Sequence, residues 1–182
     1  MTKEAARFNE GKPRFTTIHP DVMDVISAEP LLIDAFARVG GYGASKYDDK
    51  LGTRLNYMLG GKNAQEYIDS ACRHAFALCR KRELRCPESG QLHMDHIVWN
   101  LTVLVAFSIS NKCEPMNVPE HIEIPCTSCI VSGDLFDFIH ALAFTKSYKL
   151  LAHDVLHGPV LNACINREIE SSKSWDSEVP NE

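Results

Sequence analysis

The chain has 182 residues, of which 45% are hydrophobic and 24% charged, and its formal net charge is −5 at pH 7. This composition excludes a globally disordered chain, and the length predicts one domain with a tail or small appendage rather than two full domains. The acidic balance argues against a general DNA- or RNA-binding protein, which usually carries a basic surface, but it leaves a nucleotide substrate open.

The sequence predicts neither export nor a membrane span. The N-terminal stretch MTKEAARFNEGKPRF has no apolar core segment, and the longest apolar run, 97–109, is too short and too polar to cross a bilayer. The seven cysteines are therefore expected to be free thiols in a reducing cytoplasm. Cys126 and Cys129 form a lone CxxC pair, which lacks the second pair of ligands that a zinc site needs.

Hydrophobic periodicity along the chain predicts an all-α fold. In chain order, we expect a helical pattern over 21–39 that Pro30 interrupts and Gly40–Gly43 ends, a loop over 44–61, and a helix over 63–82 that Asn63 caps. The strongest helix is predicted over 92–110, and a proline-containing connector follows over 111–129. Further helices are predicted over 132–157 and 159–171, before a polar tail. Only 122–124 and 130–131 hint at extended structure.

The helix predicted over 63–82 carries Arg73 and His74 next to each other, with His74 at the edge of the apolar face. Glu66 and Asp69 lie opposite that face, where a solvated ion-pair surface is the simpler explanation. Arg73 is harder to explain in this way, because its neighbour His74 borders the core.

Three polar residues share one stripe of the helix predicted over 92–110, namely His93, His96 and Asn100. Ile97, Leu104 and Phe107 share the stripe, so it is the core-facing side, whereas Asp95 points away. One buried histidine is usually only a hydrogen-bonded core residue. Two histidines one turn apart, with an asparagine one turn further along the helix, also have the spacing at which metal ligands on a helix converge.

Two carboxylates, Glu83 and Glu88, lie between the histidine-bearing helices. A negative charge at the C-terminal end of a helix, as at Glu83, opposes the helix dipole and favours a functional role. The glycine-rich segment 41–47 ends in Lys46 and Tyr47 but lacks the ending of a Walker loop. It is either a helix cap followed by a turn or a phosphate-binding loop with Tyr47 against a base.

Five motifs in this order resemble the phage dATP/dGTP diphosphohydrolase family that includes MazZ. They are Phe8-Asn-Glu-Gly-Lys-Pro-Arg14, Gly43-Ala-x-Lys-Tyr47, Arg73-His74, Glu83 with Glu88-Ser-Gly90, and His93-x-x-His96-x-x-x-Asn100. The resemblance covers roughly residues 8–108. It divides the chain into a catalytic domain over 1–110 and a connector with a helical extension over 111–182.

The resemblance implies an all-α pyrophosphohydrolase, related to MazG-type enzymes, that converts dGTP or dATP to the monophosphate and pyrophosphate with a divalent metal (Mg, Mn or Co). In a phage, the dGMP would feed diaminopurine nucleotide synthesis in the cytoplasm of the bacterial host. The candidate roles are catalysis for Glu83, Glu88 and Arg73, substrate binding for Lys46, Tyr47 and Asn100, and metal binding for His74, His93 and His96. His93-x-x-His96 stands where MazG-type enzymes have a second acidic pair, which leaves the ligand set and the general base open.

Two other functions remain open. His153-Asp154 is a literal HD pair, as in HD-type triphosphohydrolases, although Asp176 in the polar tail is a poor choice for the later aspartate that such a site needs. A non-catalytic nucleotide-binding or assembly protein is the second alternative. The apolar residues between Leu135 and Leu151 fit core packing and a contact between two copies equally well, and a homo-oligomer is expected.

Overall fold

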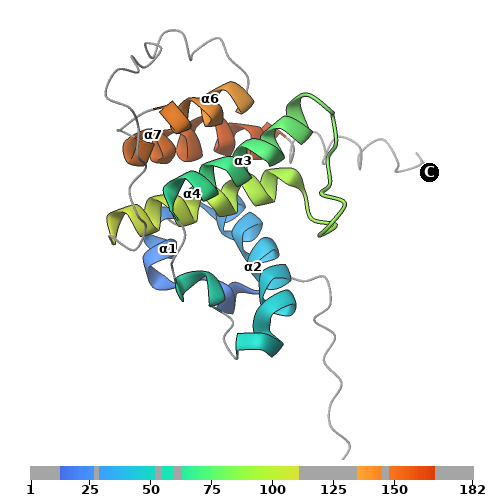
Figure 1. Ribbon diagram of the computed structural model, residues 1–182, viewed down its shortest axis with the longest axis vertical. Coiled ribbons are helices and arrows are strands. Elements are labelled where there is room, and N and C mark those ends of the chain that lie inside the picture. Colours follow the sequence, from blue (N-terminus) through green and yellow to red (C-terminus); the bar gives the residue numbers. More distant parts are fainter. Residues whose placement is uncertain are drawn as a thin grey trace, which may run out of the picture.

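The computed structural model describes residues 13–26, 29–51, 55–59, 63–110, 135–144 and 148–166 (Figure 1). Within these ranges every regular element is helical, and an isolated bridge pairs Arg85 with Leu92. The all-α prediction is therefore confirmed. The Cys126–Cys129 pair, the hints of extended structure over 122–124 and 130–131, and most of the first family motif lie outside the described residues.

The helices form three layers, and the middle layer is a pair of helices (Figure 1). The central layer is α3 (Ala64–Cys79) beside α4 (His93–Ile109), with α1 (Pro20–Ile26) and α2 (Pro30–Leu51) on one side and α6 (Leu135–Ala141) and α7 (Tyr148–Val155) on the other. Short turns of 3-10 helix lie at Phe15–Thr17, Asn56–Leu59 and Leu142–Phe144. A π-helical turn at Leu156–Val160 continues α7 into helical residues 161–166.

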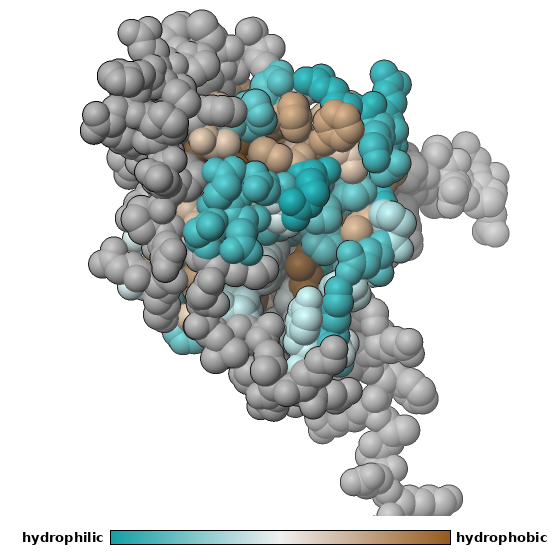
Figure 2. All heavy atoms as spheres, viewed as in Figure 1, coloured by the Kyte–Doolittle hydropathy of each residue, from teal (hydrophilic) through white to brown (hydrophobic). Residues whose placement is uncertain are grey.

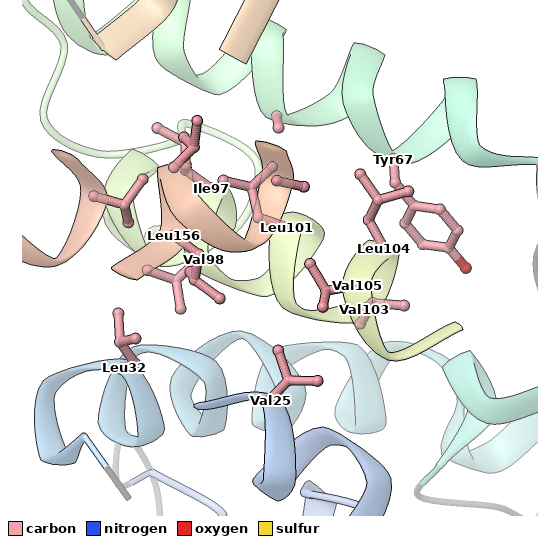
Figure 3. Packing of buried hydrophobic residues seen from close by; sticks show 14 of the residues in the cluster. Val25, Leu32, Tyr67, Ile97, Val98, Leu101, Val103, Leu104, Val105 and Leu156 are labelled. Carbon is pink, nitrogen blue, oxygen red and sulfur yellow. The ribbon is translucent and has the colours of Figure 1, made fainter. Parts of the chain in front are cut away.

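Helix α4 is the centre of the core because helices from both outer layers pack against it. Ile97, Leu101 and Leu104 are completely buried, and Figure 3 shows them along α4, which lies between the helix that carries Tyr67 and the helices that carry Leu32 and Val25. The helix predicted over 92–110 is confirmed as α4. None of the described helices is long and apolar enough to cross a membrane.

The C-terminal helices bury their apolar residues within this chain. Ile139, Leu142 and Val155 join the same hydrophobic cluster as α3 and α4, and Leu135 and Phe138 pack against it. His157 on the π-helical turn also bonds the backbone carbonyl of Val25 on α1 through Nε2, at 2.8 Å. Of the two explanations for the apolar residues of this region, core packing therefore accounts for those that the structure describes.

The prediction that Gly40–Gly43 ends the helix is wrong, since α2 runs through these glycines to Leu51. A Cβ at Gly40 would lie 2.5 Å from Thr17 Oγ1, and one at Gly41 would lie 3.3 Å from Arg14 Cγ. The segment before α1 thus packs directly on the glycine backbone. This tertiary contact offsets the low helix propensity of glycine, and residues 44–51, expected in a loop, become the last turns of α2.

Candidate active site

A cavity of about 770 Å³ opens between α2, α3 and α4. In the space-filling view of Figure 2 this face is hollowed below the hydrophilic residues of α3. The lining includes seven of the nine residues predicted for the site, namely Lys46, Tyr47, Arg73, His74, Glu88, His96 and Asn100. Glu83 and His93 do not line the cavity, but they lie directly behind its histidines, as described below.

The last turns of α2 supply one wall of the cavity. Tyr42, Lys46 and Tyr47 lie on one stripe of the helix, so the segment predicted as a phosphate-binding loop presents its side chains from a helix. Lys46 Nζ donates to Glu88 Oε1 at 2.5 Å, and this bond raises the pKa of Lys46 and lowers that of Glu88. Both side chains are exposed, so a competing anion can reach this ion pair.

Helix α3 supplies the opposite wall. The predicted cap is present, since the Asn63 side chain accepts a hydrogen bond from the Glu66 N–H at 3.0 Å. Glu66, Asp69 and Arg73 are exposed and also line the cavity, so the solvated face predicted for Glu66 and Asp69 is at the same time one wall of the cavity. These three residues are spaced at i, i+3 and i+7, as are the polar residues His93, His96 and Asn100 of α4. This shared spacing is the sequence signal that could have revealed the cavity face of α3.

The three candidate histidines come together where α3 meets α4. His74 Nδ1 lies 2.8 Å from His93 Nδ1, and the rings of His74 and His96 stack with centroids 4.2 Å apart and planes at 5°. His96 Nε2 bonds the Ser89 hydroxyl at 2.7 Å, which joins the cluster to the turn between the helices.

Burial is the main reason that all three imidazoles favour the neutral state. Desolvation, with help from His96, His93 and Arg73, lowers the pKa of His74 to about 3. Burial also lowers the pKa of His93, although the Glu83 carboxylate opposes that change, and it lowers the pKa of His96. A cluster of neutral imidazoles can accept protons but carries no charge of its own near neutral pH.

The histidine arrangement does not fit a site in which all three bind one metal ion. Ligands to one ion must aim their nitrogen lone pairs at a common point about 2.0–2.1 Å away. Parallel stacked rings keep those lone pairs in separate planes, and the Nδ1 atoms of His74 and His93 already face each other. Among the residues that the structure describes, no three His, Cys, Asp or Glu side chains are arranged to hold a metal.

The buried end of the cavity is aromatic. Tyr57, Tyr67 and Trp99 line it, and the Tyr57 ring meets the Trp99 ring edge-on at 5.7 Å. The Tyr57 hydroxyl is fixed, because it donates to the Thr17 carbonyl at 3.0 Å and accepts from the His19 N–H at 3.1 Å. A flat, aromatic base fits such a surface. These residues were missed in the sequence because each one also fits an ordinary core position.

Asn100, predicted to bind substrate, bonds the backbone of its own helix rather than a histidine ring. Its side-chain amide donates to the His96 backbone carbonyl at 2.8 Å. The amide oxygen is left to accept from another group, and Asn100 lines the aromatic end of the cavity beside Trp99.

Glu83 and Glu88 have different surroundings. Glu88 belongs to the turn from Cys86 to Gly90, which is closed by the Gly90 N–H donating to the Cys86 carbonyl at 2.8 Å and by a positive φ of 70° at Gly90. Glu83 lies before this turn and outside the cavity lining, with Oε2 3.9 Å from His93 Nε2.

The HD pair lies elsewhere. His153 and Asp154 are both exposed on α7, and neither lines the cavity. Asp176 lies outside the described residues. The placement of His153 and Asp154 therefore does not favour an HD-type site.

Comparison with known proteins gives one match. A family model for the N-terminal region of dATP/dGTP diphosphohydrolases matches residues 2–115, which include α1 to α4 and every residue of the cavity. No curated protein and no solved structure matches the chain.

Proposed function

The chain belongs to the dATP/dGTP diphosphohydrolase family, and from this premise we propose that the cavity between α2, α3 and α4 binds the deoxynucleoside triphosphate and cleaves it. Enzymes of this kind hydrolyse the nucleotide to its monophosphate and pyrophosphate. The observation that carries the assignment to this cavity is its chemical asymmetry. Cationic side chains, Lys46 and Arg73, line the same cavity as a buried aromatic end formed around Trp99.

This asymmetry matches the two ends of the substrate. The base would stack at the aromatic end, where the Asn100 amide oxygen can accept from a base N–H. The phosphates would lie toward Lys46 and Arg73, and Tyr47 lines the same wall as Lys46. Lys46 is exposed, and among the described residues it contacts Glu88 and the rings of Tyr42 and Tyr47, so the phosphates can replace Glu88 as its partner.

Cleavage requires water to attack the α-phosphorus while pyrophosphate leaves with the electron pair of the broken P–O bond. Negative charge grows on the leaving pyrophosphate during this step. Arg73 and Lys46 are positioned to neutralise this charge, which is the largest contribution that fixed cations make to phosphoryl transfer.

We propose that the reaction also needs a divalent cation, Mg, Mn or Co. Since the three histidines do not fit a single-ion site, the residues that would hold the cation are Glu66 and Asp69, which line the cavity one turn apart. Mg²⁺ is usually held by one or two carboxylates together with substrate phosphates rather than by an all-protein cage. When bound, the cation would polarise the phosphoryl oxygens.

One finer part of the proposal rests on the sequence resemblance alone, namely that dGTP is the physiological substrate, whose dGMP product supplies diaminopurine nucleotide synthesis in a phage. A general role in reducing dATP or dGTP pools would need the same residues. The homo-oligomer, expected from the apolar residues between Leu135 and Leu151, stays a prediction.

Product analysis tests the proposal. The purified chain is incubated with each dNTP and NTP in Mg, Mn, Co or EDTA, and nucleotides and phosphates are separated by chromatography. We expect dGMP or dAMP with one equivalent of pyrophosphate, and no product in EDTA. Release of nucleoside and triphosphate would instead support HD-type chemistry, and no turnover with any cation would leave a binding protein.

A further inference from the structure

The contact between His74 and His93 restricts where their protons lie. The two Nδ1 atoms are 2.8 Å apart, so one of them donates and the other accepts. A neutral imidazole carries one N–H, and the choice made at Nδ1 therefore also decides whether Nε2 of the same ring is a donor or an acceptor.

Glu83 decides between the two arrangements. His93 is 4% exposed, and its Nε2 is buried 3.9 Å from Glu83 Oε2, with no hydrogen-bond partner among the residues that the structure describes. A hydrogen on His93 Nε2 faces this carboxylate favourably, whereas a lone pair there would face a negative charge. With its hydrogen on Nε2, His93 accepts at Nδ1, and His74 must donate from Nδ1. The His74 Nε2 then carries a lone pair.

We propose that His74 Nε2 is the general base of the hydrolysis, and that His93 and Glu83 are positioning residues that keep it unprotonated. This assignment rests on the proposed function of the cavity, which His74 lines together with Arg73 and Lys46. His96 suits the role less well, because its Nε2 is already bonded to the Ser89 hydroxyl at 2.7 Å.

The step balances as follows. A water molecule loses one proton to His74 Nε2 while its oxygen forms a bond to the α-phosphorus. The bond between that phosphorus and the bridging oxygen breaks, and pyrophosphate leaves with the electron pair. The monophosphate keeps the oxygen of the water, and no oxidant or further reactant is consumed.

When His74 Nε2 accepts the proton of the water, the pair of His74 and His93 gains a positive charge, and its surroundings favour moving this charge away from His74. Burial, the stacked His96, His93 and Arg73 all disfavour a cation at His74, and the charge of Glu88 opposes them. As Nε2 gains its proton, the Nδ1 proton can pass along the 2.8 Å contact to His93. There burial and Lys81 still disfavour a cation, but the Glu83 carboxylate and the Arg85 backbone carbonyl oppose them.

The first test reads the tautomers without any catalysis. In the unliganded full chain with ¹⁵N-labelled histidine, long-range ¹H–¹⁵N correlations report which ring nitrogen carries the proton. We expect the Nδ1–H form for His74 and the Nε2–H form for His93, and a mixture of forms in Glu83→Gln. Finding His74 in the Nε2–H form in the unmodified protein would overturn the proposal.

The second test separates chemistry from binding. Glu83→Gln should lower kcat at least about 10-fold with KM for dGTP within about twofold, and His74→Gln should lower kcat about 100-fold or more. Glu29→Gln and His153→Gln, which make the same changes outside the cavity, serve as controls and should keep the unmodified rate. Unchanged kcat in Glu83→Gln or His74→Gln would overturn the assignment. If the unmodified chain hydrolyses no dNTP, the proposed function fails, while the tautomer measurement still decides the geometry of the pair.

Discussion

The guanidinium of Arg38 on α2 holds the carboxylate of Asp95 on α4 through two hydrogen bonds, Nε to Oδ2 at 2.7 Å and Nη2 to Oδ1 at 3.1 Å. Asp95 is completely buried, although the helical wheel placed it on the side away from the core. It immediately precedes His96, so this ion pair fixes α2 against the turn of α4 that carries the histidines.

Removing the cation of this pair should strongly destabilise the fold. Arg38→Met leaves a buried carboxylate without its bidentate partner, and the free energy of unfolding is expected to fall by about 3–5 kcal/mol. Asp34→Asn removes the other, half-exposed carboxylate that Arg38 contacts and should cost less than about 1 kcal/mol. Urea denaturation at pH 7.5 measures both. Equal losses in the two variants would contradict the importance assigned to Asp95.

Gly40 and Gly43 have different surroundings on α2, so replacing each by alanine should change the stability of the protein in opposite directions. A Cβ at Gly40 meets Thr17 Oγ1 at 2.5 Å, so Gly40→Ala is expected to destabilise the protein by about 1–3 kcal/mol. A Cβ at Gly43 meets nothing within 4 Å, so Gly43→Ala should stabilise the helix by about 0.5–1 kcal/mol. Thermal unfolding of the two variants gives the comparison, and a stabilised Gly40→Ala protein would show that the Thr17 contact yields easily.

The sequence predicts the local features of this fold well. The Asn63 cap, the apolar periodicity of α4 and the inward stripe of His93 and Asn100 all depend on residues close together in the chain. Local patterns of this kind determine helix bounds and faces.

The features that were missed depend on contacts between distant segments. Gly40 is helical where the Thr17 side chain packs on it, and Asp95 is buried because Arg38 reaches it from another helix. Glu66 and Asp69 are exposed, as the wheel of one helix predicts, but the cavity that they border is formed by three helices and was missed. Tertiary placement of this kind cannot be read from the periodicity of one segment.

Acid should destabilise the protein through its histidine cluster. Burial holds the pKa of His74 at about 3, whereas an unfolded histidine titrates near about 6.5, so between these values the unfolded chain binds the proton that the folded chain excludes. The contribution of neutral His74 to the free energy of unfolding is therefore complete above pH about 6.5 and is lost as the pH falls toward about 3. His93 and His96, whose pKa values burial also lowers, should act in the same direction.

Urea midpoints between pH 8 and pH 4 test this expectation. The unmodified chain should lose stability across the range, and His74→Gln should show a shallower dependence. His153→Gln, which changes an exposed histidine on α7, should retain the full dependence. A midpoint independent of pH from 7 to 5 would contradict the neutral, buried state of the cluster.

Lys46 should contribute to substrate binding rather than to the fold. Its ion pair with Glu88 is exposed, so its loss is expected to leave the urea midpoint nearly unchanged. Lys46→Met removes a charge-assisted contact to phosphate, worth about 1.5–3 kcal/mol, and should raise the Kd for a non-hydrolysable dGTP analogue about 10- to 100-fold. Lys46→Arg should restore part of the affinity. A Lys46→Met protein with unchanged affinity would place the phosphates elsewhere in the cavity.

The carboxylates of α3 should govern the dependence on divalent cations. If Glu66 and Asp69 hold the cation together with substrate phosphates, Glu66→Gln and Asp69→Asn should each raise the Mg²⁺ concentration for half-maximal rate about 10-fold or more, because Mg²⁺ relies on few carboxylates. Asp69 also accepts a hydrogen bond from Gln65 at 2.7 Å, so Gln65→Ala separates loss of this contact from loss of charge. Asp154→Asn on α7 removes a carboxylate far from the cavity lining and is the matched control. A titration of rate against Mg²⁺ at saturating dGTP decides the matter, since an unchanged midpoint in both α3 variants would assign the cation to other residues.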